Sequence, residues 1–334
     1  MRYVFLLVIS LLTLTAGAAL SLWIYSRPTG LDETLRITLA PGSSARAIGA
    51  QLEREGIVRS GRIFAWTVRL QGLSQALEAG TYALNGLRDT PGVIQQLLKA
   101  PLQMRRATIP EGLTRHETAG VLARQGIVDS LRFVELSGSE TLAATLGIQA
   151  STLEGYLFPE TYFFAIDDGE EEVIRRLVDQ FHRVLAGVPE DRLGAIGLDL
   201  HQAVTLASIV EREAQVAQER PVIAGVFLRR LSFNRRLESC ATVEYALGVH
   251  KKRLTNADLR VESPFNTYRH RGLPPAPIGS PGEAALKATF FPEQTEFLYF
   301  VARGDGTHIF SRTHTEHEAA KQLVKRQAQR GSLN

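Results

Sequence analysis

Residues 201–214 read His-Gln-Ala-Val-Thr-Leu-Ala-Ser-Ile-Val-Glu-Arg-Glu-Ala, and our interpretation of the chain starts from this stretch. Apolar residues recur in it at helical spacing without an intervening Gly or Pro, so it predicts an α-helix. One face of that helix combines Glu211 with small and apolar side chains, because positions three, four and seven apart are stacked. A carboxyl group in such surroundings is partly desolvated and keeps its proton to higher pH, as a general acid must. The alternative is a solvated glutamate, for which Glu213 is the better candidate because it points elsewhere.

Three segments outside this helix carry groups typical of binding sites. Residues 153–162 read Leu-Glu-Gly-Tyr-Leu-Phe-Pro-Glu-Thr-Tyr, an aromatic-rich stretch broken by Gly and Pro that we expect to pack on the core or line a groove. Asn266-Thr-Tyr268 precedes residues 272–282, a loop too rich in Pro and Gly to be a helix or a central strand. Residues 296–302 and 307–311 flank Gly-Asp-Gly, which predicts a hairpin with His308 on its second strand.

The N-terminal half contains two similar segments at an offset of seventy residues, 38–60 and 108–130. Each predicts a strand, a Gly turn, a helix capped by Ser or Thr, a Gly C-cap and a short apolar exit. Two copies are too few for a solenoid, and such small strand-turn-helix units are similar to LysM-like carbohydrate-binding modules.

The first residues of the chain suggest a membrane anchor. Residues 4–25 are uncharged, and a span needs about 20 apolar residues. A cleaved signal peptide is the competing interpretation, but the apolar run continues past its small-residue site to Trp23 and Tyr25, an aromatic pair of the kind found at span ends. We expect a retained single-pass anchor with the short N-terminus inside and the bulk of the protein outside the cytoplasmic membrane.

Composition narrows the class of protein. The chain has 334 residues, 44% hydrophobic and 22% charged, which is typical of a globular protein of two or three domains. A net charge of +3 without a concentrated basic stripe argues against nucleic acid as a partner. The single cysteine, Cys240, excludes an internal disulfide, a multi-cysteine metal site and an acylated cysteine next to the apolar segment.

Five motifs, taken together and in their order along the chain, resemble those of the YceG-like family, the MltG-type endolytic murein transglycosylases. They are 153–162, Leu206-Ala-Ser-Ile-Val-Glu-Arg-Glu213, Asn266-Thr-Tyr268, the 272–282 loop and Thr307-His-Ile-Phe310. The resemblance implies that Glu211 is the catalytic residue and that the substrate is the glycan strand of nascent peptidoglycan near the membrane. Where the family pattern suggests Asp-Pro-Thr-Val, this chain has Cys240-Ala-Thr-Val243, which puts in doubt any role of that Asp.

In a lytic transglycosylase one carboxyl group protonates the glycosidic oxygen between MurNAc and GlcNAc. It then accepts a proton from the C6 hydroxyl of the same MurNAc, which attacks C1 and leaves a 1,6-anhydro end. Because the substrate supplies the nucleophile, a second carboxylate is not required. We expect no cofactor and no metal, and Asn266, Tyr268, Tyr156 and His308 are the candidate substrate-binding residues.

Two alternatives remain open at this point. A metallohydrolase would use His308, His314 and His317, although these lack a His-Glu-x-x-His signature. A non-enzymatic, membrane-anchored protein would bind peptidoglycan as a scaffold. Cell-wall synthesis enzymes are candidate partners in either case.

The predicted fold class is α+β. We expect a cytoplasmic tail (1–3), a transmembrane anchor (4–25), a linker (26–34), a LysM-like subdomain (35–102), a second small strand-helix unit (103–150) and a larger mixed α/β catalytic domain (151–330).

Overall fold

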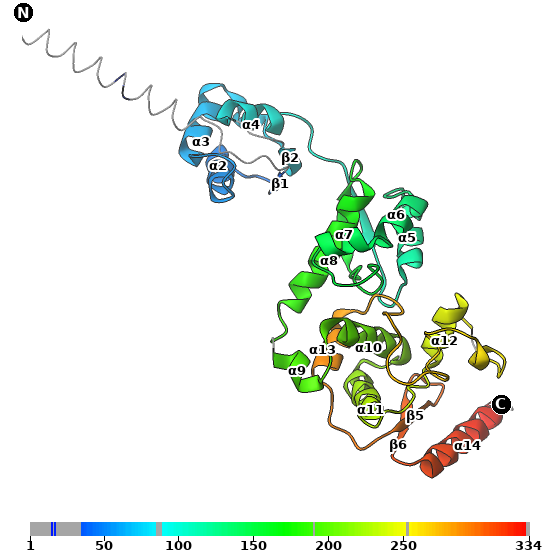
Figure 1. The fold of residues 1–334 in the computed structure, drawn as a ribbon. Helices are drawn as coiled ribbons and strands as arrows, with labels where there is room; N and C mark the ends of the chain where they lie inside the picture. The colour runs from blue at the N-terminus through cyan, green and yellow to red at the C-terminus, as the bar shows by residue number, and fades with distance from the viewer. Residues whose placement is uncertain are drawn as a thin grey trace, which may run out of the picture. The chain divides into compact units, whose positions relative to one another are not determined.

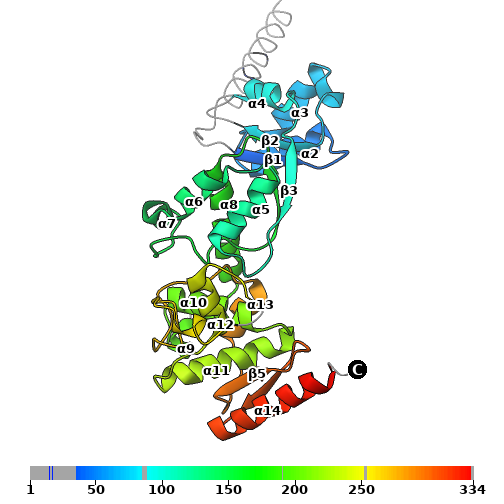
Figure 2. The same cartoon turned by 90° about the vertical axis from the view of Figure 1, so that its right-hand side faces the viewer.

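The computed structural model describes residues 35–84, 89–189, 191–251 and 254–331, together with Thr15 and Gly17. It has a mixed α+β fold, as predicted, and its strands pair into two-stranded sheets (Figures 1 and 2). The predicted tail, anchor and linker lie outside the described residues apart from Thr15 and Gly17. Within the described part of the chain, no helix combines the length and apolarity that crossing a bilayer requires.

The chain divides into two compact units, with the boundary between Met104 and Arg105. This boundary is close to the limit predicted at 102, and residues from both sides of 150 share one hydrophobic core in the second unit. The separate unit predicted at 103–150 stays a prediction.

The first unit packs helices against one antiparallel strand pair. Its elements are β1 (Leu35–Leu39), α2 (Ala45–Arg54), α3 (Gly61–Leu70), β2 (Gly80–Leu84) and α4 (Thr90–Leu97). In the β1–β2 pair Leu35 lies opposite Leu84 and Leu39 opposite Gly80. Alternate strand residues, Ile37 and Leu39, contribute to this unit's core together with buried side chains of the helices.

The internal repeat predicted from sequence is present as repeated local structure. In the second copy β3 (Met104–Thr108) precedes α5 (Arg115–Arg124), as β1 precedes α2 in the first. Ser44 and Thr114 cap the two helices through their hydroxyl groups, and Gly56 and Gly126 follow with φ of 70° and 65°. Only glycine adopts this left-handed conformation without strain, which explains the Gly at each helix end.

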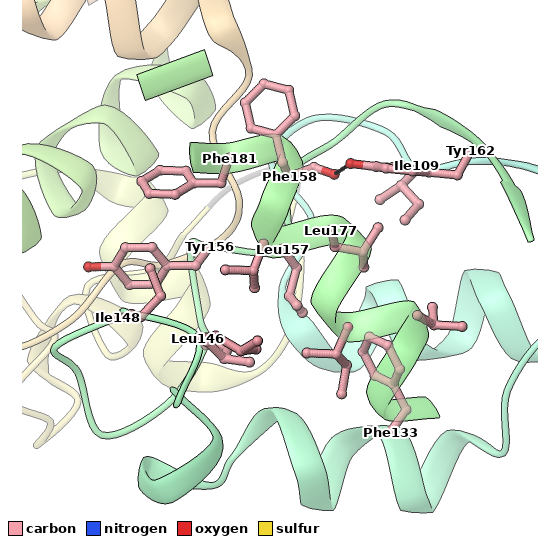
Figure 3. Close-up of a cluster of buried hydrophobic side chains, with 14 of the residues drawn as sticks. Ile109, Phe133, Leu146, Ile148, Tyr156, Leu157, Phe158, Tyr162, Leu177 and Phe181 are labelled. Carbon is pink, nitrogen blue, oxygen red and sulfur yellow. Dashed lines mark hydrogen bonds between the residues drawn. The ribbon is translucent and has the colours of Figure 1, made fainter. Parts of the chain in front are cut away.

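The second unit begins with helices around a short strand pair. After β3 and α5 come α6 (Ser130–Ser137), α7 (Glu140–Thr145), β4 (Thr161–Ala165) and α8 (Glu170–Leu185). Strand β3 pairs with β4, where the hydroxyl groups of Thr108 and Thr161 are 2.9 Å apart. The aromatic segment 153–162 packs its side chains against α8, and Figure 3 shows the Tyr156 ring in this cluster with its hydroxyl directed away.

Helix α10 (Leu200–Glu213) is central to the rest of the unit. It starts at a capping box between Asp199 and Gln202, and every side chain from Ala203 to Val210 is buried. It packs against α11 (Arg220–Ser232), α12 (Cys240–Leu247) and α13 (Glu283–Phe290). The remaining helix, α9 (Asp191–Ile196), precedes α10 in the chain.

The chain ends in the predicted hairpin and helix. Strand β5 (Tyr299–Ala302) pairs antiparallel with β6 (His308–Ser311), and α14 (His314–Gly331) lies beside both strands (Figure 1). The 272–282 loop has no helix or strand, and the backbone N–H of Ile278 donates to Ser208 Oγ at 3.0 Å, which fixes this loop to α10.

Candidate active site

A groove of about 1110 Å³ opens at the C-terminal end of α10. The segment between α11 and α12, the loop with Tyr268 and Arg271, the β5–β6 hairpin and α14 contribute most of the remaining surface. Chemically distinctive residues of the lining are Glu213, Cys240, Tyr268, Tyr299 and His308. The groove therefore contains one carboxyl group from the helix that the sequence singled out, but that group is Glu213.

Glu213 is not the solvated residue that helical periodicity suggested, so this prediction is wrong. The Ser239 hydroxyl donates a 2.5 Å hydrogen bond to Glu213 Oε1. Burial raises the pKa of the Glu213 carboxyl, although hydrogen bonds from Ser239 and from the backbone N–H of Ala241, and the nearby His308, act in the opposite direction. A carboxyl group that keeps its proton and borders a large groove has the properties of a general acid.

The Asn266-Thr-Tyr268 motif supports the Ser239–Glu213 contact and contributes to the groove. The Asn266 amide donates to the carbonyl oxygens of Leu259 and Val261, and its Oδ1 accepts from the backbone N–H of Tyr268. Thr267 Oγ1 accepts from the backbone N–H of Ser239 at 3.0 Å. Thus Asn266 fixes the turn, Thr267 holds Ser239 next to Glu213, and Tyr268 faces the groove.

Glu211 lies in a different environment, and it is not among the residues that line the groove. Its side chain is 6% exposed. Oε1 accepts from Arg220 Nη2 at 3.0 Å, and Oε2 accepts from the backbone N–H of Gly282, at the start of α13, also at 3.0 Å. A second carboxyl group lies near this pair, because Glu111 Oε2 is 3.7 Å from Arg220 Nη2. Burial, together with the neighbouring Glu211, raises the pKa of Glu111. Both oxygens of Glu211 are therefore used in contacts between elements of the fold.

The other predicted substrate-binding residues divide between the groove and the interior. Tyr268 and His308 line the groove, whereas Tyr156 and Asn266 do not. The Tyr156 side chain is buried, and its hydroxyl is 2.8 Å from Nδ1 of His201. The polar atoms of Tyr156 and Asn266 have partners within the protein, and their predicted contacts with sugar stay untested predictions.

The Glu219 carboxylate holds the His308 ring in place. Nδ1 lies 2.7 Å from Glu219 Oε2, and the backbone N–H of His308 donates to Glu219 Oε1 at 3.0 Å. These two contacts with Glu219 fix the position of the His308 ring in the groove. Sequence reasoning missed Glu219, which lies eighty-nine residues away from His308.

Cys240 lies at the first turn of α12, directly after Ser239. Its Sγ is 3.2 Å from the Tyr268 hydroxyl, and burial raises the pKa of the thiol. The departure from the family pattern noted in the sequence is thus located in the groove. Sequence reasoning missed Ser239, although the position of Cys240 in that motif was a signal for it.

The histidines of the metallohydrolase alternative are used differently. His308 contacts Glu219, while the ring of His317 stacks on Tyr299 with centroids 5.2 Å apart. Within the described ranges, no group of three or more His, Cys, Asp or Glu side chains is arranged to hold a metal ion.

Comparison with known proteins places the chain in a family. The YceG-like family matches residues 37–323. This chain belongs to the YceG-like family. The resemblance inferred from the five sequence motifs is thereby confirmed.

Relatives of this YceG-like chain have assigned activities. A Bacillus subtilis (strain 168) protein named endolytic murein transglycosylase is 31% identical over 305 residues, which cover 86% of this chain and 84% of that protein. A protein of the same name from Streptococcus pneumoniae serotype 2 is 29% identical over 80% of this chain, but the match covers only 54% of that protein. The crystal structure of a YceG-like protein from Listeria monocytogenes has 31% sequence identity and a TM-score of 0.59, covering 86% of this chain and 99% of that one.

Proposed function

We propose that this protein is an endolytic murein transglycosylase that cleaves the MurNAc–GlcNAc bond of nascent glycan strands and leaves 1,6-anhydro-MurNAc ends. Such cleavage would terminate strand elongation. Family membership and the activity named for the Bacillus subtilis relative support this function. The structural observation that carries it is the Glu213 carboxyl, whose pKa is raised by burial and which borders a groove large enough for several sugars.

We assign the acid and base role to Glu213 rather than to Glu211. In the first step the Glu213 carboxyl transfers its proton to the glycosidic oxygen as the bond from that oxygen to C1 of MurNAc breaks. In the second step the C6 hydroxyl forms the new bond to C1, and its proton passes to the Glu213 carboxylate. The acid is restored and no water is consumed, so one carboxyl group is sufficient.

The contacts of Glu213 suit both steps. Burial raises the pKa of the carboxyl, which favours the protonated form that the first step needs. After the transfer, the Ser239 hydroxyl and the backbone N–H of Ala241 stabilise the carboxylate. Tyr268 and His308 offer an aromatic face and a ring nitrogen for the sugars on either side of the cleaved bond.

Paired variants of the two glutamates test the assignment. We expect Glu213→Gln to lower the formation of anhydro products at least about a hundredfold, because it removes the transferable proton, while bound strands are retained. Glu211→Gln is the matched variant on the same helix and should retain cleavage. Products are identified by mass, and thermal unfolding verifies that both variants fold.

The opposite result would be equally clear. Loss of cleavage in Glu211→Gln with full activity in Glu213→Gln would return the catalytic role to Glu211. Normal cleavage by both variants would refute a mechanism based on this helix. If the wild type retains strands in a pull-down but never shortens them, the protein is a scaffold.

We further propose that residues 4–25 anchor the protein in the cytoplasmic membrane with the catalytic part outside, and that residues 35–102 act as a LysM-like glycan-binding unit. The uncharged N-terminal run and the repeated strand-turn-helix structure support these assignments. Deletion of residues 1–34 should release the protein from membranes in a fractionation experiment. Continued sedimentation with membranes would contradict the anchor.

A further inference from the structure

One wall of the groove carries three arginines from two neighbouring loops. Arg235 and Arg236 lie between α11 and α12, and Arg271 lies just after Tyr268. Arg236 and Gly272 form a parallel β-bridge, and Arg271 Nη1 donates to the carbonyl oxygen of Asn234 at 3.2 Å. Because these contacts join the two loops, the three side chains belong to one structural element, which we call the arginine wall.

The backbone of this element is held in an unusual conformation. Asn234 and Glu238 have φ of 50° and 53°, and among the described residues they are the only ones other than glycine with positive φ. Such a conformation is unfavourable for L-residues and persists where the surrounding contacts impose it. Here the backbone N–H of Glu238 donates to the carbonyl oxygen of Thr267, the residue that also anchors Ser239. Thr267 therefore contacts both the arginine wall, through Glu238, and the Glu213 site, through Ser239.

The acidic residues of the groove already have partners. Glu238 pairs with Arg230 at 3.0 Å, and Glu318 pairs with Lys321 at 2.8 Å. Glu213 accepts the hydrogen bond from Ser239. These three acids therefore do not neutralise the wall.

The arginines of the wall, in contrast, lack an acidic partner. Arg235 Nη2 donates to the Tyr299 hydroxyl at 2.8 Å, and Arg271 contacts a carbonyl oxygen. Within residues 35–84, 89–189, 191–251 and 254–331, no carboxylate pairs with Arg235, Arg236 or Arg271. The wall thus presents uncompensated positive charge to whatever occupies the groove.

Guanidinium groups bind carboxylates through paired, charge-assisted hydrogen bonds. The sugars of a murein strand are uncharged. Its carboxylates lie on the lactoyl side of MurNAc, either along a stem peptide or, on a strand without peptides, on the lactoyl group itself. A stem peptide offers several carboxylates at increasing distance from the sugar, which suits a row of three arginines.

We propose that the arginine wall binds the carboxylates of MurNAc stem peptides, so that the enzyme selects peptide-bearing strands over bare strands. This inference rests on the proposed function and names the form of the substrate. The wall contributes specificity, whereas Glu213 carries out the chemistry.

The test compares the same glycan strands before and after an amidase has removed their peptides. We expect the wild type to have a kcat/KM about tenfold or more higher for the peptide-bearing strands, the factor that about 1.4 kcal/mol of binding provides. The double variant Arg236→Gln/Arg271→Gln should bring this ratio close to one by lowering kcat/KM for the peptide-bearing strands. Arg236→Lys should give an intermediate ratio, because Lys keeps the charge but not the paired hydrogen bonds.

Arg303→Gln is the matched control, since Arg303 is exposed and is not part of the groove lining. It should leave the ratio unchanged. A ratio near one in the wild type would overturn the inference, as would an unchanged ratio in the double variant. An equal loss on both substrates would assign the wall to the lactoyl carboxylate and would also overturn it.

Failure of the inference can be distinguished from failure of the proposed function. If Glu213→Gln still cleaves but the double variant loses the preference, the catalytic assignment fails and the wall stands. If the wild type cleaves neither substrate, a pull-down of both strand types decides: preferential retention of peptide-bearing strands by the wild type but not by the double variant supports the wall, and equal retention overturns it.

Discussion

The hydroxyl of Ser239 donates a 2.5 Å hydrogen bond to Oε1 of Glu213 and so joins the start of α12 to the end of α10. Burial of Glu213 favours its protonated form, while this hydrogen bond favours the carboxylate. The balance of the two effects sets the pH at which the proposed acid loses its proton.

Ser239→Ala should therefore move the pH profile of the enzyme. Without this donor the pKa of Glu213 rises further, so the decline of kcat/KM with rising pH should shift upward. A hydrogen bond to a charged group is worth about 1.5–3 kcal/mol, which corresponds to a shift of about one to two pH units. Ser232→Ala is a suitable control, because the Ser232 hydroxyl contacts only its own helix, at Arg229. An unchanged alkaline limb in Ser239→Ala would show that Glu213 does not control the rate.

Glu154 makes the stability of the second unit depend on pH. Burial raises the pKa of this carboxyl from 4.5 to about 7, although the backbone N–H of Arg115 and the Tyr245 hydroxyl donate to it. The folded chain holds the proton more tightly than the unfolded chain, so this contribution is complete below about pH 4.5 and is lost as pH rises to about 7.

The predicted change in the free energy of unfolding is at most about 3 kcal/mol across that window. Glu154→Gln should remove this part of the pH dependence, which denaturant titrations at pH 5 and pH 7.5 would measure. Glu140→Gln, on an exposed side chain, should behave as the wild type. A slope of equal size in Glu154→Gln would refute the prediction.

Cys240 offers a direct probe of the groove, because it is the only cysteine in the chain and it lies in the groove lining. We expect a maleimide to attach once, and slowly at pH 7 because burial raises the pKa of the thiol. The adduct next to Glu213 and Tyr268 should block strand cleavage. Mass spectrometry and activity assays before and after labelling test this, with Cys240→Ser as the resistant control; full activity in the labelled protein would place the substrate elsewhere.

Helices α2 and α3 of the first unit touch through two glycines. A Cβ on Gly49 would collide with the Gly61 carbonyl oxygen, and a Cβ on Gly61 with that of Gly49. We expect Gly49→Ala to destabilise this unit by about 1–3 kcal/mol, the usual cost of overpacking. Hydrogen exchange should accelerate in α2 and α3 and remain unchanged in the second unit.

The matched substitution is Gly194→Ala in α9, where an added Cβ would meet no described atom within 4 Å. Alanine has the higher helix propensity, so this variant should be neutral or slightly more stable. Unchanged exchange in α2 after Gly49→Ala would mean that the helices can separate without loss.

Local structure followed from local signals in the sequence. The capped helices, the Gly exits of the two repeats and the Gly-Asp-Gly hairpin depend on residues only a few positions apart. The family motifs lie in the same part of the fold because several of them pack around α10: Ser208 holds the 272–282 loop, and Thr267 holds the start of α12 through Ser239.

The choice between Glu211 and Glu213 could not be made in this way. Periodicity identifies a functional face when one side of a helix is polar, but α10 is buried on all sides from Ala203 to Val210. The environment of each glutamate is set by distant segments: Arg220 and Gly282 contact Glu211, whereas Ser239 contacts Glu213. Nothing in residues 201–214 specifies which segment lies on which side.

The turns of the two repeat copies also differ in the space around their glycines. Gly42 and Gly112 occupy equivalent places with φ of 75° and 77°, yet a Cβ on Gly42 would meet no described atom within 4 Å, whereas one on Gly112 would touch Glu211 and Arg212. A short epitope tag or a fluorophore attached at the Gly42 turn would therefore report on the protein in cells without disturbing the helix that carries Glu213. The same insertion at Gly112 would place its bulk beside Glu211 and Arg212 of that helix, so the pair of sites separates a label on the first unit from one that reports on α10.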